Sequence, residues 1–95
     1  MSLSDLERWY ATRCNGDWEH QYGISIETLD NPGWRVKIDL RETPKAASRL
    51  GVQKSERSEN DWMQYWTEHE RFQIACGPLN LSEAIDIFLD WFKAT

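Results

Sequence analysis

The sequence predicts an α+β fold in which an antiparallel sheet of four or five strands is flanked by an N-terminal and a C-terminal helix, in the order α-β-β-(β)-β-β-α. Apolar residues recur with helical spacing at both ends of the chain, whereas in the middle they alternate with period two. A turn sequence separates two of the alternating runs. The 95 residues are too few for two hydrophobic cores, so we expect a single domain over residues 1–95.

The N-terminal segment has the pattern of an amphipathic helix. Leu6, Trp9 and Tyr10 fall at positions i, i+3 and i+4 of an otherwise charged stretch. Ser4 is followed three residues later by a glutamate, which is the spacing of a capping box, and an Asn-Gly pair ends the pattern. The first helix is therefore predicted near residues 4–14.

Two half-buried strands are predicted next. Apolar and polar residues alternate from Tyr22 to Glu27 and again from Trp34 to Leu40. The Leu-Asp-Asn-Pro-Gly sequence at residues 29–33 contains the residue types that favour turns. The two strands should therefore form a hairpin.

A second hairpin is predicted in the second half of the chain. Residues 61–67 and 71–76 are rich in aromatic and β-branched side chains around a polar connection. Residues 41–59 are polar and interrupted by proline and glycine, which fits either a long loop or a loop with a weak edge strand.

The last segment predicts an amphipathic helix over residues 81–93 that packs on the sheet. Asn80 and Glu83 have capping-box spacing at its start. The apolar side chains of one helical face are Leu81, Ile85, Phe88, Leu89 and Phe92.

The charge of the chain restricts its partners. Sixteen acidic against eleven basic residues give a net charge of −5, which repels nucleic acid and favours basic partners. No apolar run approaches the roughly 18 residues of a membrane span, and no export signal is visible. Two cysteines without a C-x-x-C motif indicate neither a zinc ribbon nor a disulfide scaffold, so we expect a cytoplasmic protein.

Residues 14–20 are the densest window of chemically active side chains. Cys14, Asp17 and His20 recur at spacings of three and would face one way in a helix, which is the basis of an alternative hypothesis, a small metal- or ligand-binding module. Gly16 argues against that helix. The sequence has no triad, phosphate-binding loop or paired-carboxylate motif, so it predicts no catalytic residue, no metal and no cofactor.

The six tryptophans divide into two groups. Trp18 and Trp62 each follow an aspartate at the edge of a predicted element, where they are either interface anchors or buried side chains with satisfied indole groups. The other four fall in apolar patterns and are expected in the core: Trp9, Trp34, Trp66 and Trp91.

Two strings of residues are specific, namely Gly-Asp-Trp-Glu-His at residues 16–20 and Leu-Asp-Asn-Pro-Gly-Trp at residues 29–34. A weaker pattern continues through Glu56–Glu59, Asp61-Trp62 and Asn80-Leu81. In these strings the chain resembles the immunity protein 53 family of bacterial toxin systems over nearly its whole length.

The resemblance implies a bacterial binding protein rather than an enzyme. Members of that family are regarded as neutralising the toxin domain of a polymorphic toxin made by the same cell. Our hypothesis for the partner is a basic nuclease, because an acidic, aromatic surface would suit the cleft that holds phosphates. The candidates for the toxin-binding surface are Asp17, Trp18, Glu19, His20, Asp30, Asn31, Pro32, Gly33, Asp61 and Trp62.

Overall fold

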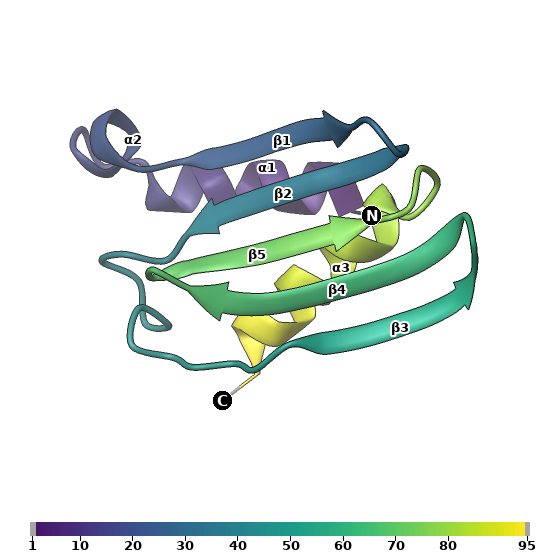
Figure 1. Cartoon of the computed structure of the whole chain (residues 1–95). Helices are drawn as coiled ribbons and strands as arrows, with labels where there is room; N and C mark the ends of the chain where they lie inside the picture. The colour runs from purple at the N-terminus through teal and green to yellow at the C-terminus, as the bar shows by residue number, and fades with distance from the viewer. Residues whose placement is uncertain (1, 95) are drawn as a thin grey trace.

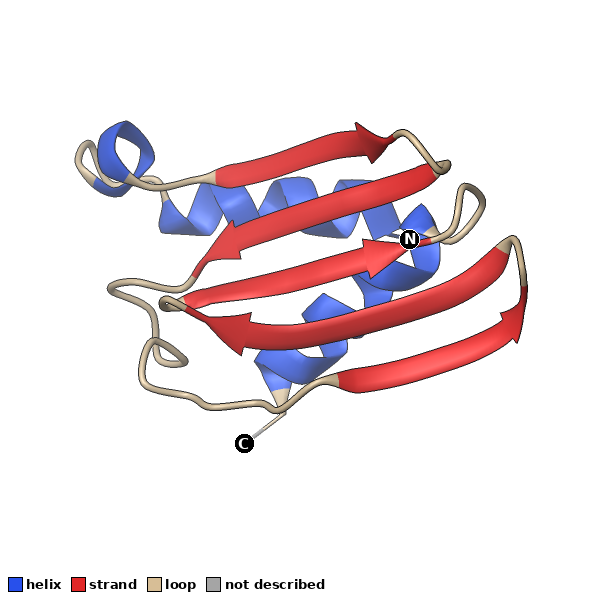
Figure 2. Cartoon of the chain, viewed as in Figure 1, coloured by secondary structure: helices blue, strands red, loops and turns tan. Residues whose placement is uncertain are grey.

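The computed structural model describes residues 2–94 and confirms the predicted α+β architecture (Figure 1). Its elements are α1 (Ser2–Arg13), α2 (Trp18–Gln21), β1 (Ile24–Leu29), β2 (Gly33–Asp39), β3 (Gln53–Ser58), β4 (Asp61–Glu68), β5 (Arg71–Cys76) and α3 (Leu81–Lys93). The strands form one antiparallel sheet in the order β1-β2-β5-β4-β3. Helices α1 and α3 lie on the same face of the sheet, and no helix covers the other face within the described residues (Figure 2).

The core lies between the sheet and the two long helices. Val36 on β2 and Ile74 on β5 are cross-strand partners, and both are fully buried on the helix side. The aromatic rings of Trp9 on α1 and Phe88 on α3 meet edge to face, with centroids 5.0 Å apart. Phe72 on β5 packs against Phe88 at 5.2 Å, so one aromatic cluster joins both helices to the sheet.

Residues 53–58 form the fifth strand, which answers the question that the sequence left open. Strand β3 pairs only with β4 at the edge of the sheet, and all six of its residues are exposed. Because neither face of β3 is buried, its sequence has no apolar alternation to indicate a strand.

Two predicted capping boxes are absent. Helix α1 already includes Ser2, so Ser4 lies inside the helix instead of capping it. Asn80 does precede α3, but its side chain makes no capping hydrogen bond. Its Oδ1 accepts a hydrogen bond from the backbone N–H of Trp62 at 3.3 Å, and this longer-range contact competes with the local cap.

Gly77 allows the chain to turn from β5 toward α3. Its N–H donates to the carbonyl of Trp62 at 2.9 Å. A Cβ atom at this position would lie 2.6 Å from the carbonyl oxygen of Asn60 and from Oδ1 of Asn80, closer than van der Waals contact allows.

No helix of residues 2–94 is long and apolar enough to cross a membrane.

We predict that Gly77→Ala lowers the free energy of unfolding by about 1–3 kcal/mol, because the new methyl group overpacks this turn. Urea denaturation of the purified variant measures the loss. Gly51→Ala is the matched control, since nothing lies within 4 Å of the position of its Cβ. Equal stability of the two variants would contradict the close approach at Gly77.

Candidate interaction surface

The ten candidate residues fall into two groups at opposite ends of the sheet. Residues 17–20 precede β1, whereas residues 30–33, 61 and 62 lie beyond its other end (Figure 1). A strand of six residues separates the two groups by roughly 20 Å. They therefore do not form one continuous surface, and we describe them as the α2 end and the turn end.

At the α2 end, Trp18 belongs to the core. Its side chain is only 2% exposed, and its indole N–H donates to the carbonyl oxygen of Arg41 at 2.8 Å. Its ring lies edge to face against Trp9, with centroids 6.0 Å apart. Of the two readings that the sequence allowed for Trp18, the structure therefore supports a buried side chain with a satisfied indole.

The polar residues around Trp18 mainly stabilise the loop that leads into it. The carboxylate of Glu19 accepts hydrogen bonds from the N–H groups of Asn15 at 2.9 Å and Gly16 at 2.8 Å. Hydrogen bonds from backbone N–H groups, its own and those of these two residues, hold the pKa of Glu19 below its ordinary value. Gly16 has φ +88°, which disfavours a side chain, so the loop needs glycine there. Asp17 also lies here and remains exposed.

The metal-binding alternative finds no cluster in this loop. The thiol of Cys14 donates to the carbonyl of Tyr10 at 3.3 Å, and Asp17 accepts a hydrogen bond from the side-chain amide of Gln21 at 3.0 Å. Within residues 2–94, no three His, Cys, Asp or Glu side chains lie where they could share a metal ion. His20 is exposed at the surface of α2.

The turn end brings three connections together. These are the β1–β2 turn, the β3–β4 turn and the β5–α3 loop, which lie side by side at one end of the sheet (Figure 1). We define the turn-end surface as Asp30, Asn31, Pro32, Glu59, Asn60 and Leu79, which are exposed, with Asp61 and Trp62, which are partly buried.

Gly33 joins two of these connections. A Cβ atom on Gly33 would overlap the carbonyl oxygen of Cys76 and would lie 3.4 Å from the ring of Trp62. The start of β2 can therefore approach the end of β5 this closely, next to the ring of Trp62, only because residue 33 is glycine. This contact gives Gly33 and Trp62 a role in the fold.

Asp61 is held by a polar network that joins the β3–β4 hairpin to the start of α3. The guanidinium of Arg57 donates to the carboxylates of Asp61 at 2.8 Å and Glu83 at 2.7 Å. The side-chain amide of Asn80 also donates to Asp61, at 2.9 Å. The hydrogen bond from Arg57 lowers the pKa of Asp61 below its ordinary value of 3.8, and the hydrogen bond from Asn80 lowers it further. Arg57 likewise holds the pKa of Glu83 below its ordinary value of 4.5.

The remaining acidic groups of the turn-end surface are unpaired. Asp30 and Glu59 are exposed, and neither takes part in an ion pair within residues 2–94. Leu79, on the β5–α3 loop at the same end of the sheet, is 92% exposed. The surface therefore combines free negative charge with an exposed apolar side chain and has no basic residue of its own.

Sequence reasoning missed Leu79. An apolar residue just before a helix cap commonly packs against the first turn of the helix, so its position suggests burial. In the structure the side chain of Leu79 instead faces solvent, while Asn80, the next residue, accepts a hydrogen bond from the backbone of Trp62 on β4. No signal in the sequence distinguishes these two outcomes.

Trp66 lies on the uncovered face of the sheet, and the prediction that it belongs to the core is wrong. The guanidinium of Arg35 stacks over its ring at 4.9 Å and also donates one hydrogen bond to the side-chain oxygen of Gln73. The indole N–H of Trp66 donates to Glu68 at 3.1 Å. The alternation along β4 places Tyr65 toward the helices and Trp66 away from them, which apolar content alone could not decide.

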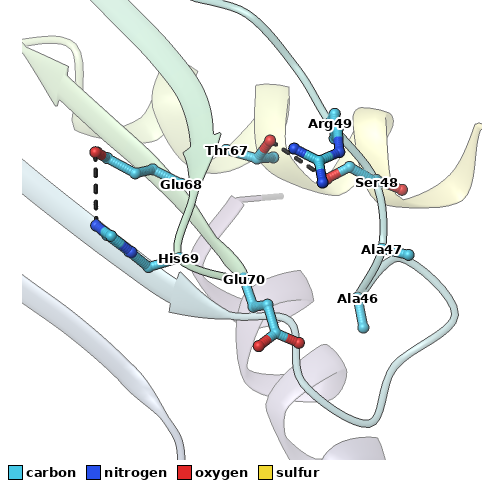
Figure 3. A pocket seen from close by; sticks show the side chains of 8 residues that line it. All are labelled: Ala46, Ala47, Ser48, Arg49, Thr67, Glu68, His69 and Glu70. Atoms are coloured by element: carbon cyan, nitrogen blue, oxygen red, sulfur yellow. Dashed lines mark hydrogen bonds and ion pairs between the residues drawn. The ribbon is translucent and has the colours of Figure 1, made fainter.

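A hollow of about 350 Å³ opens near the α2 end, between residues 46–49 and 67–70 (Figure 3). Thr67 fixes the loop at its wall, because its hydroxyl oxygen accepts from the N–H of Leu50 at 2.8 Å. His69 and Glu70 form the hairpin turn with φ of 56° and 58°, a conformation that glycine and asparagine prefer. None of the ten candidate residues lines this hollow.

We predict that Trp18→Ala lowers the free energy of unfolding by about 3–5 kcal/mol, because it leaves a large cavity and an unpaired carbonyl at Arg41. Chemical denaturation followed by circular dichroism measures the loss. His20→Ala, on the same short helix but exposed, should leave stability nearly unchanged. A small loss for Trp18→Ala would contradict its place in the core.

We predict that the stabilisation provided by Arg57 disappears in acid. The folded-state pKa values of Asp61 and Glu83 are lowered, so their contribution is complete above the unfolded values of 3.8 and 4.5 and is lost as pH falls through the folded values. Melting temperatures of the wild-type protein and Arg57→Gln should differ at about pH 7 and converge only once the pH has fallen below the folded values, which lie under 3.8 for Asp61 and under 4.5 for Glu83. A difference that persists unchanged in acid would contradict this network.

Comparison with known proteins adds family information to this geometry. The family model for immunity protein 53 matches residues 3–93, which cover both ends of the sheet and both long helices. Comparisons with curated proteins and with solved structures found no match. The match spans nearly the whole chain, and the protein therefore belongs to the immunity protein 53 family.

Proposed function

We propose that this immunity protein binds a cognate toxin domain in the cytoplasm and blocks it by direct contact, without catalysing a reaction, through the turn-end surface. The proposal is carried by the unpaired carboxylates of Asp30 and Glu59, which lie on the two turns on either side of the loop that carries the exposed Leu79 (Figure 1). Six of the ten candidate residues, at positions 30–33, 61 and 62, lie in or directly beneath this surface.

The charge of this surface supports a basic partner. Asp30, Glu59 and Asp61 are acidic, and the basic group next to them, Arg57, is already shared between Asp61 and Glu83. A nuclease toxin carries positive charge where it holds the phosphates of its substrate, and free carboxylates compete for such a cleft. The turn end therefore fits occlusion of a basic active site.

Leu79 supports the proposal as an apolar anchor. A leucine that is 92% exposed contributes nothing to the core, whereas an apolar side chain buried in a partner's pocket contributes strongly to binding. Its neighbours in the surface are polar or acidic, so they can form the rim around this contact.

The rigidity of the turn end also favours binding. Gly33 packs against Trp62, and Arg57 and Asn80 tie the β3–β4 hairpin to α3. A surface that is ordered before binding loses little conformational entropy on association. These contacts assign Gly33, Asp61 and Trp62 a supporting role and leave direct contact to the exposed residues.

The α2 end is the second candidate because Asp17 and His20 are exposed there. Its negative charge is less available to a partner, because the carboxylate of Glu19 accepts hydrogen bonds from backbone N–H groups. Arg41 adds a positive charge at this end, where its guanidinium lies 5.4 Å from the ring centroid of Tyr22. A basic cleft should therefore prefer the turn end.

We predict that the wild-type protein co-purifies with the C-terminal toxin domain of any large secreted protein encoded beside it and rescues cells that express this domain. Charge reversal by Asp30→Lys with Glu59→Lys should weaken binding on the order of tenfold or more and make it less dependent on salt. Leu79→Ala should weaken binding about tenfold without this change in salt dependence. Titration calorimetry at two salt concentrations measures both effects.

Asp17→Lys is the matched control at the α2 end and should leave the affinity unchanged. All variants should retain the wild-type melting temperature, because the substituted side chains are exposed. If Asp17→Lys abolishes binding and the turn-end variants do not, the α2 end is the toxin-binding surface. If no toxin domain binds the wild-type protein, the proposed function is wrong.

A further inference from the structure

Strand β1 lies at an edge of the sheet with a row of unused backbone groups. The carbonyl of Gly23 accepts a hydrogen bond from Asp39 on β2 at 3.0 Å. Because hydrogen-bonding groups alternate along an antiparallel strand, every second residue after Gly23 also faces β2. The N–H and C=O groups of Ile24, Ile26 and Thr28 therefore point away from the sheet, as three donors and three acceptors.

The two edges of the sheet differ in how well they are protected against pairing. The other edge strand, β3, carries Lys54, Glu56 and Arg57, and its register shifts between Glu56 and Ser58. Charged side chains and such irregularities are the usual features that keep edges unpaired. Strand β1 has no proline, lysine or arginine, its pairing is regular, and Glu27 is its one charged residue.

Apolar side chains are exposed along the β1 edge on the helix side. Ile26 is 38% exposed and Tyr10 on α1 is 39% exposed. Leu3, seven residues before Tyr10 and thus on the same side of α1, is 61% exposed. Between helix and strand lies a groove of about 420 Å³, lined by Leu6, Glu7, Tyr10, Tyr22, Gly23 and Ile24.

We propose that β1 pairs with β1 of a second copy of this chain, antiparallel and centred on Ile26, to form a symmetric dimer with a continuous ten-stranded sheet. In this register Ile26 faces its own equivalent, and Ile24 faces Thr28 of the second copy. All outward groups are then used, in six hydrogen bonds. The apolar side chains of both copies meet on the helix side, next to the groove.

Several registers would keep the helix-side side chains of both copies on one face of the joined sheet. Among them, the number of backbone hydrogen bonds and the pairing of polar side chains favour the register centred on Ile26. Registers centred on Ser25 or on Glu27 pair only four of the hydrogen bonds, and the latter sets two glutamates directly opposite each other. Centred on Ile26, Glu27 faces Ser25 of the second copy. The hydroxyl of Ser25 already donates to Glu27 of its own strand at 3.4 Å, so the two groups are complementary across the dimer axis.

This self-complementarity favours a second copy over a foreign strand. Any strand could pair with the row of backbone donors and acceptors, but a two-fold axis through Ile26 also brings each carboxylate to a hydroxyl and sets apolar side chains opposite one another on the helix side. The dimer leaves Glu59, Asn60 and Leu79 of the turn-end surface free and places Asp30, just beyond β1, beside the second copy. The inference rests on the free edge of β1 and not on the toxin-binding proposal.

Analytical ultracentrifugation of the wild-type protein should show a species of twice 11.3 kDa that dissociates on dilution. Ile26→Pro removes an outward N–H group, which an edge strand tolerates, and should weaken dimerisation about tenfold or more. Lys54→Pro, at an outward-facing position of β3, is the matched control and should leave the dimer intact. A wild-type protein that remains monomeric at all concentrations would overturn the proposal.

Cross-linking tests the register even if a proline variant fails to fold. In a Cys14→Ser background, Ile26→Cys should form a disulfide between copies on oxidation, because Cα atoms of directly opposed strand residues lie about 5.5 Å apart. Thr28→Cys should not, since it faces Ile24 of the second copy. Cross-linking at residue 28 but not 26, or equally at both, would refute the Ile26-centred dimer.

Discussion

The structure depends on covering one face of a five-stranded sheet with two helices. Trp9 is central to this arrangement, because its ring contacts both α3 and the short helix α2 before β1. Its ring centroid lies 5.0 Å from that of Phe88 and 5.3 Å from that of Phe92 on α3, and 6.0 Å from that of Trp18. Truncation of Trp9 would remove these ring contacts and so weaken the packing of α1 against α3 and over the half of the sheet near β1. Because the helices occupy one face, the ends, edges and other face of the sheet remain for contacts with other molecules.

This division explains why conspicuous residues differ in what they do. Trp18 lies in the core, and its neighbours in the loop serve to place it there. Residues at the turn end are less constrained, since a turn needs particular backbone angles only at a few positions. Unusual composition alone therefore does not separate residues that hold the fold from residues that are free to contact a partner, whereas burial does.

The sequence was sufficient for the elements whose apolar pattern reports burial. Strand β5 at Arg71–Cys76 and helix α3 at Leu81–Lys93 have the predicted bounds, because one face of each is packed. Strand β3 could not be predicted because it buries neither face, and its place depends on pairing with β4. Asn80 and Leu79 could not be predicted either, because a contact with Trp62, distant in sequence, overrides the local capping pattern.

The irregular edge strand β3 limits how far the sheet can be extended. A flat sheet that could accept strands at both edges would be a template for filaments, in which each added chain exposes the next site. Here the charges of β3 and its shifted register disfavour the addition of another strand at that edge of the sheet. We therefore expect that assembly ends once a strand has been added at the other edge, so that the protein does not grow into filaments.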